Sequence, residues 1–138
     1  MQFAQIRDYI EVGPREAQPM DVSGLLGTWV NSNPDTTGVA RMTVGESGGK
    51  FSVRVYAIGP EGIVDWGSAD ISVYASSPTT HVATGFTCVY DFGFVETRLQ
   101  AMILKGLIVL AQIHRFKDDS GRTDYFVREY FKVDHNRY

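Results

Sequence analysis

The chain has 138 residues, which is enough for one domain and too few for two of ordinary size. Hydrophobic residues make up 43% of it, so a core can form, and its 14 glycines and frequent aromatic residues are typical of strands joined by turns. Subtracting 16 acidic from 13 basic residues leaves a net charge of −3 that is spread along the chain. This balance excludes the basic stripe of a nucleic-acid-binding protein.

Other classes are excluded by single features of the sequence. Cys88 is the one cysteine, so no internal disulfide can form, and no cluster has the spacing of zinc ligands. The opening MQFAQIRDYIEVG carries acidic residues and lacks the apolar core of a signal peptide. The longest apolar run, GLIVLA at residues 106–111, is too short to span a bilayer. We therefore expect a cytoplasmic protein with no metal, no cofactor and no membrane partner.

Residues 1–23 differ from the rest of the chain because they show no two-residue alternation. They predict an N-terminal arm or a short helix at about residues 3–11, followed by a loop. Asp21 to Leu25 suit one helical turn with Asp21 or Ser23 as its cap. The remaining residues, 24–138, are expected to form the domain.

From residue 26 onward apolar and polar residues alternate with a period of two, which predicts strands. Eight such stretches are separated by turn residues: 26–31, 39–44, 50–58, 63–74, 81–92, 95–104, 107–116 and 122–133. Short links between consecutive strands favour antiparallel neighbours, and closure removes the two exposed edges of such a meander. The prediction is an all-β fold, an eight-stranded antiparallel up-and-down barrel with a short N-terminal helix or arm. A barrel of this size is filled by side chains or holds one small ligand.

The first strand, LLGTWVNSN at residues 25–33, resembles the first-strand signature of the calycins, the group of lipocalins, fatty-acid-binding proteins and avidins. The resemblance implies a lipocalin- or streptavidin-like barrel in which Gly27 lets the chain enter the closed end. It also implies that Trp29 plugs this floor and that Asn31 lines the ligand pocket.

The last strand adds a second resemblance, because FVREYFKV at residues 126–133 is similar to the final strand of fatty-acid-binding proteins. It implies that Arg128 and Tyr130, which share a face, point inward and hold a carboxylate. Arg128 would also stack over Trp29, as an arginine does in lipocalins. The alternative is that the other face, with Glu129 and Phe131, turns inward and leaves Arg128 and Tyr130 on the surface.

The inner strands leave further alternatives open. Residues 51, 53, 55 and 57 are apolar and predict the interior face of their strand, with Arg54 outside. Trp66 is either a flat wall for a ligand or part of a subunit contact. Cys88 and Tyr90 share a face; Cys88 is expected to be a small buried residue, and Tyr90 is a candidate ligand contact.

Residues 107–111 are apolar on both faces, which predicts that the N-terminal arm or another subunit covers the outside and makes a homo-oligomer one alternative. His114 follows on the face of Leu110 and Gln112. If that face is inward, His114 is the best general base or haem ligand; otherwise it is a hydrogen-bonded histidine at the rim.

The sequence therefore predicts binding of a small, mostly apolar or carboxylate-bearing molecule inside the barrel, a hydrophobic or anionic organic ligand. The candidate ligand contacts are spread over five of the predicted strands: Asn31, Trp66, Tyr90, His114, Arg128 and Tyr130. The alternative is a small barrel isomerase or cyclase in which His114 or Tyr130 acts as the acid or base. A third hypothesis is a self-associating structural module.

Overall fold

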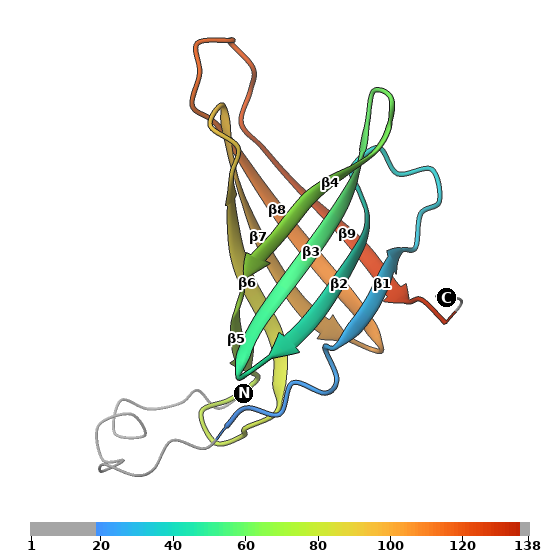
Figure 1. Ribbon diagram of the computed structural model, residues 1–138, viewed down its shortest axis with the longest axis vertical. Helices are drawn as coiled ribbons and strands as arrows, with labels where there is room; N and C mark the ends of the chain where they lie inside the picture. The colour runs from blue at the N-terminus through green and yellow to red at the C-terminus, as the bar shows by residue number, and fades with distance from the viewer. Residues whose placement is uncertain (1–18, 136–138) are drawn as a thin grey trace, which may run out of the picture.

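The computed structural model describes residues 19–135, so the helix or arm predicted within residues 1–18 lies outside the described residues. The described chain forms nine antiparallel strands and no helix (Figure 1). The strands are β1 (Gly27–Asn31), β2 (Val39–Ser47), β3 (Lys50–Gly59), β4 (Gly62–Asp70), β5 (Ser72–Ala75), β6 (Ala83–Asp91), β7 (Val95–Leu104), β8 (Leu107–Phe116) and β9 (Tyr125–Val133). No helix within residues 19–135 has the length and apolar character needed to cross a membrane.

The alternation of side chains confirms the predicted all-β meander. β7 and β8 have the predicted bounds, and the interior face predicted for β3 is buried at Val53, Val55 and Ala57. Arg54 lies outside, where it forms an ion pair with Asp65. Hydrogen bonds join the strands in the order β4-β3-β2-β1-β9-β8-β7-β6-β5, so consecutive strands pair except β4 with β5, and β1 pairs with β9.

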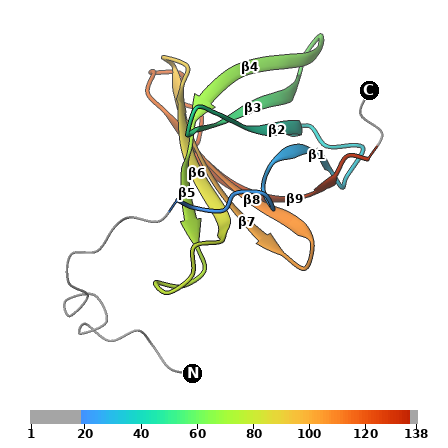
Figure 2. The ribbon, with the colours of Figure 1, turned by 60° about the horizontal axis from the view of Figure 1, so that its bottom comes forward.

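The predicted closed barrel of eight strands is wrong, because the sheet is open and its edges are β4 and β5. The stretch predicted as one strand, residues 63–74, breaks at Ile71. The backbone N–H of Ile71 donates to the carbonyl of Phe51 at 3.0 Å, and its side chain is buried. On one side of this break β4 pairs with β3, and on the other β5 pairs with β6. The sheet therefore curls round a core while β4 and β6 stay without a ladder between them (Figure 2).

A β-bulge in β4 changes which side chains turn inward. Val55 is opposite Gly67 and Tyr56 is opposite Asp65, so Trp66 is the extra residue. Gly67 has φ +81°, which favours glycine, and its N–H donates to the Asp65 carboxylate at 2.8 Å. The bulge shifts the two-residue alternation, which explains why neither face of this stretch reads as core in the sequence.

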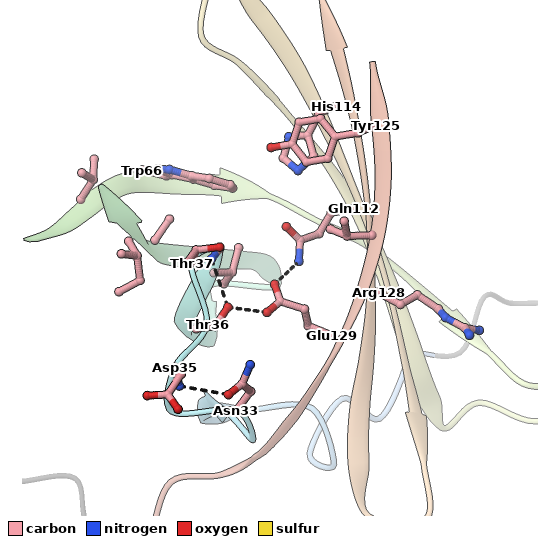
Figure 3. A pocket seen from close by; sticks show the side chains of 16 residues that line it. Asn33, Asp35, Thr36, Thr37, Trp66, Gln112, His114, Tyr125, Arg128 and Glu129 are labelled. Atoms are coloured by element: carbon pink, nitrogen blue, oxygen red, sulfur yellow. Dashed lines mark hydrogen bonds between the residues drawn. The ribbon is translucent and has the colours of Figure 1, made fainter. Parts of the chain in front are cut away.

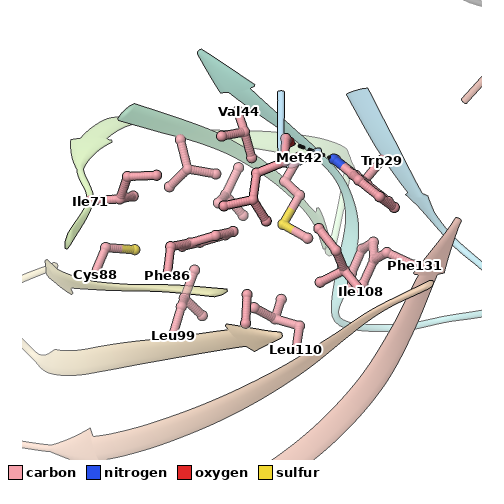
Figure 4. Close-up of a cluster of buried hydrophobic side chains, with 14 of the residues drawn as sticks. Trp29, Met42, Val44, Ile71, Phe86, Cys88, Leu99, Ile108, Leu110 and Phe131 are labelled. Carbon is pink, nitrogen blue, oxygen red and sulfur yellow. Dashed lines mark hydrogen bonds between the residues drawn. The ribbon is translucent and has the colours of Figure 1, made fainter. Parts of the chain in front are cut away.

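The core fills the part of the curled sheet nearest the β2–β3 and β7–β8 hairpins. Large buried side chains from several segments of the chain meet in it, among them Leu25, Trp29, Met42, Phe86, Leu99, Ile108, Leu110 and Phe131 (Figure 4). Trp29 is 4% exposed, and its indole N–H donates to the carbonyl of Leu25 at 2.9 Å. Gly27 has φ +117°, so the turn into β1 requires a residue without a side chain.

The predicted stacking of Arg128 over Trp29 is wrong. In the register of β1 and β9, Trp29 is opposite Val133, five residues along the strand from Arg128. At about 3.3 Å per residue this separates the two positions by roughly 16 Å. Trp29 instead packs within the apolar core.

Tyr90 crosses the gap between the unpaired strands β4 and β6. Its hydroxyl donates to the carbonyl of Gly67 at 2.7 Å and lies 3.3 Å from that of Val53. Its ring lies edge-on to that of Trp66, with centroids 5.4 Å apart. The Tyr90 hydroxyl therefore supplies a hydrogen bond between β6 and β4 at the bulge, where no ladder pairs these two strands.

We expect Tyr90→Phe to lower the free energy of unfolding by about 1–2 kcal/mol, because a half-buried carbonyl loses its donor while the ring stays. Urea denaturation followed by fluorescence measures this. The matched control is Tyr56→Phe, since the Tyr56 ring lies by Arg41 and its hydroxyl has no hydrogen-bond partner among residues 19–135. Equal losses in the two variants would contradict the bridging role.

Candidate functional site

The apolar core ends part-way along the sheet, and beyond it lies a cavity of about 610 Å³. It is bounded by the β1–β2 loop, the ends of β3 and β4, and the facing ends of β8 and β9 (Figure 3). Its lining includes Asp35, Thr36, Trp66, Gln112, His114 and Glu129.

The cavity has two chemically different walls. The wall from β2, β3 and β4 is apolar and consists of Val39, Ala57, Ile58, Val64 and Trp66. The opposite wall from β8 and β9 carries polar groups, and Figure 3 shows Gln112, His114 and Glu129 on the side of these strands that faces Trp66. A molecule between these walls would meet an apolar surface on one side and hydrogen-bonding groups on the other.

Glu129 is the centre of the polar wall. Its half-buried carboxylate accepts hydrogen bonds from Asn31 Nδ2 at 2.6 Å, Thr36 Oγ1 at 2.5 Å and Gln112 Nε2 at 2.8 Å. These donors belong to β1, the β1–β2 loop and β8, so one side chain ties three segments to β9. All three donors are neutral, and no ion pair of the described residues includes Glu129.

Asn31 connects Glu129 to the β1–β2 loop and to the start of β2. Its amide also donates to the carbonyl of Val39 at 2.9 Å, and its oxygen accepts from the Asn33 N–H at 2.8 Å. The side chain is 5% exposed and lies outside the set of lining residues. The expected pocket asparagine therefore holds Glu129 and the loop and does not itself line the cavity.

His114 lies on the inward face of β8, at the end of the polar wall. Its Nδ1 is 2.8 Å from the hydroxyl of Thr97, and its ring stacks on Tyr125 with centroids 4.2 Å apart. Burial lowers the pKa of His114 below its ordinary value of 6.5, because the charged imidazolium loses hydration. The ring is therefore neutral at neutral pH.

Of the six predicted ligand contacts, the structure brings Trp66 and His114 together in the cavity. Tyr90 lies behind Trp66 and is used in the bridge to β4. Burial raises the pKa of Tyr90, which keeps the hydroxyl protonated as a donor.

The predicted inward orientation of Arg128 and Tyr130 is wrong. Phe131 is fully buried and Glu129 faces the cavity, so the alternation of β9 turns Arg128 and Tyr130 to the outer face. Tyr130 is 42% exposed, and Figure 3 shows the Arg128 side chain directed away from the cavity that its residue borders. A carboxylate held by these two residues inside the sheet is therefore excluded.

Two other expectations concern residues away from the cavity. Cys88 is buried, and burial raises the pKa of its thiol to about 12, so it is an unreactive core residue. The outer face of β7–β9 mixes the exposed hydrophobic residues Met102, Phe126 and Tyr130 with exposed charged residues such as Arg98 and Arg128. The homo-oligomer predicted from this face stays a prediction.

Glu129 and Gln112 were not among the predicted contacts. The sequence does carry a signal for Glu129, since Val127, Phe131 and Val133 flank it at two-residue spacing and mark its face as the inner one. A charged residue in an otherwise apolar inward series is costly unless it has hydrogen-bond partners. Those partners come from distant segments, so their identity is not evident in the sequence.

The chain matches no protein-family model, no curated protein and no solved structure to which it was compared. Residues 19–135 also contain no group of three or more histidine, cysteine, aspartate or glutamate side chains that could hold a metal ion.

We expect Glu129→Ala to lower the free energy of unfolding by about 2–3 kcal/mol, because three hydrogen bonds to a carboxylate are lost together. Glu129→Gln should lose much less, since Gln112 can turn its amide and accept from the new side-chain NH₂ group. Chemical denaturation measures both, and amide exchange in residues 32–38 should rise in Glu129→Ala. Equal stability of Glu129→Ala and the wild type would contradict the tethering role.

The lowered pKa of His114 predicts that stability falls as pH drops below about 6.5, because the unfolded chain binds a proton that the buried imidazole does not. His114→Gln, which can still bond to Thr97, should lose this component of the pH dependence. Denaturant titrations from about pH 8 to about pH 5 measure it. His81→Gln, at the other end of the molecule, should retain the wild-type dependence. An unchanged dependence in His114→Gln would contradict the assignment.

Proposed function

We propose that this protein binds a small, mostly apolar molecule in the cavity between the Trp66 wall and the Glu129–His114 wall. The observation that carries the proposal is the cavity itself, whose volume of about 610 Å³ falls within the roughly 300–1,000 Å³ of small-molecule sites. Such sites combine a largely apolar lining with a few polar groups that orient the ligand. The two walls described above have this composition.

The resemblance to calycins supports the same proposal. The structure is an all-β antiparallel sheet that curls around its core, which is compatible with a β-barrel-like fold. We propose a calycin-like architecture in which Trp29 and the core fill one end and the ligand occupies the other. Arg128 does not support a carboxylate-bearing ligand in this cavity, because its side chain points outward.

An isomerase or cyclase acting on a flexible hydrophobic substrate is the second candidate. It is favoured by His114, whose burial lowers its pKa and so keeps the imidazole neutral, as a general base must be. Tyr130 lies on the outer face, away from a substrate in the cavity, and so is not the acid or base of this candidate. A carrier releases its ligand unchanged, whereas this alternative requires turnover that depends on His114.

We expect the protein to bind the neutral dye Nile red with a rise in fluorescence, and Val64→Trp to weaken this binding at least about tenfold by filling the cavity. Val89→Trp is the matched control, because Val64 and Val89 are each 46% exposed and only Val64 lines this cavity. Fluorescence titration measures both variants. Absence of dye binding, or an equal effect of the two substitutions, would contradict the proposal.

A further inference from the structure

We propose that the ligand of this cavity carries a positively charged nitrogen, an ammonium or amidinium group attached to an apolar or aromatic body, and that Glu129 binds that nitrogen. The inference rests on the proposed function and adds the chemical class of the ligand. It replaces the anionic ligand that the sequence suggested with one of the opposite charge.

The lining of the cavity is acidic. Glu129 receives three hydrogen bonds, all from neutral groups, so they stabilise the carboxylate without cancelling its charge. Asp35 borders the same cavity, and the one cationic side chain among the lining residues, Arg128, points away from it (Figure 3). A half-buried charge without an opposite charge is costly, and a ligand cation would offset that cost.

Glu129 also has a free acceptor position. Oε2 accepts from Asn31 and Thr36, whereas Oε1 accepts from Gln112 alone. Each carboxylate oxygen accepts about two hydrogen bonds, so one position on Oε1 remains for a donor from a ligand. A Cβ added at Gly38, another lining residue, would lie 2.8 Å from Oε1, so glycine keeps this space clear.

The opposite wall presents a fixed aromatic face. The indole of Trp66 is held in place by edge-on contacts with Tyr90 and Phe92, at centroid distances of 5.4 and 5.2 Å. A fixed aromatic face suits the apolar body of a ligand, and it also attracts a cation that lies over the ring. A ligand carboxylate would instead face Glu129, and the repulsion between like charges would weaken its binding.

Three probes of similar size test the charge preference directly: the 2-phenylethylammonium ion, its neutral analogue 2-phenylethanol and the anion phenylacetate. We expect the full-length protein at neutral pH to bind the ammonium probe at least about tenfold more tightly than the alcohol, and the anion more weakly than both. Amide-resolved NMR titration measures the dissociation constants and reports whether Trp66 and His114 respond.

Glu129→Gln should remove the preference for the ammonium probe over the alcohol, because the variant lacks the negative charge. Glu46→Gln is the matched control, since Glu46 is exposed near the β2–β3 hairpin, and it should retain the preference. Circular dichroism checks that both variants fold. If Glu129→Gln does not fold, the three-probe comparison in the wild type still decides the charge preference.

The outcomes separate this inference from the proposed function. Equal or tighter binding of the alcohol or the anion overturns the inference, as does a preference that persists in Glu129→Gln. Failure of all three probes in a protein that binds Nile red also overturns the inference and leaves the proposed function standing. Failure of the three probes and of Nile red overturns both.

Discussion

The burial of Phe131 decides which face of β9 turns into the molecule, and the character of the cavity follows from it. Phe131 is fully buried in the core. Because strand side chains alternate, Glu129 must then face inward, and Arg128 and Tyr130 must face outward. A shift of one residue in the register of β9 would exchange its inward and outward side chains, so that Arg128 and not Glu129 would face the cavity. The alternative of a buried Arg128 would have required Phe131 to be exposed, which loses roughly 2–3 kcal/mol of apolar burial.

The open edge of the sheet has its origin in β4. The bulge at Trp66 and Gly67 and the break at Ile71 turn the chain from pairing with β3 to pairing with β6. No ladder then joins β4 to β6, and Tyr90 bridges them at the bulge. The same bulge aims Trp66 into the cavity. The feature that prevents closure thus also builds the apolar wall of the candidate site.

The boundary between core and cavity follows a change of residue type along β8. Its inward face has leucine and isoleucine near the β7–β8 hairpin and then Gln112 and His114 toward the β8–β9 loop. Across from them, Ala57 is too small to fill the space. Polar groups at the end of a core need partners, and here Thr97, Glu129 and the β1–β2 loop supply them. The result is a cavity whose polar wall is already hydrogen-bonded before a ligand enters.

The sequence by itself determined the all-β class, the bounds of β7 and β8, the inward face of β3 and the burial of Trp29 and Cys88, because these depend on local alternation and apolar content. It also pointed to Trp66 and His114 as candidates, and the structure places both at the cavity. Only the tertiary structure decided the open edge, the face of β9 and the role of Glu129. Each of these depends on a contact between distant segments: Ile71 with Phe51, Phe131 with the core, and Glu129 with Asn31, Thr36 and Gln112. Periodicity within one strand shows that two faces exist, but the partners across the sheet decide which face is buried.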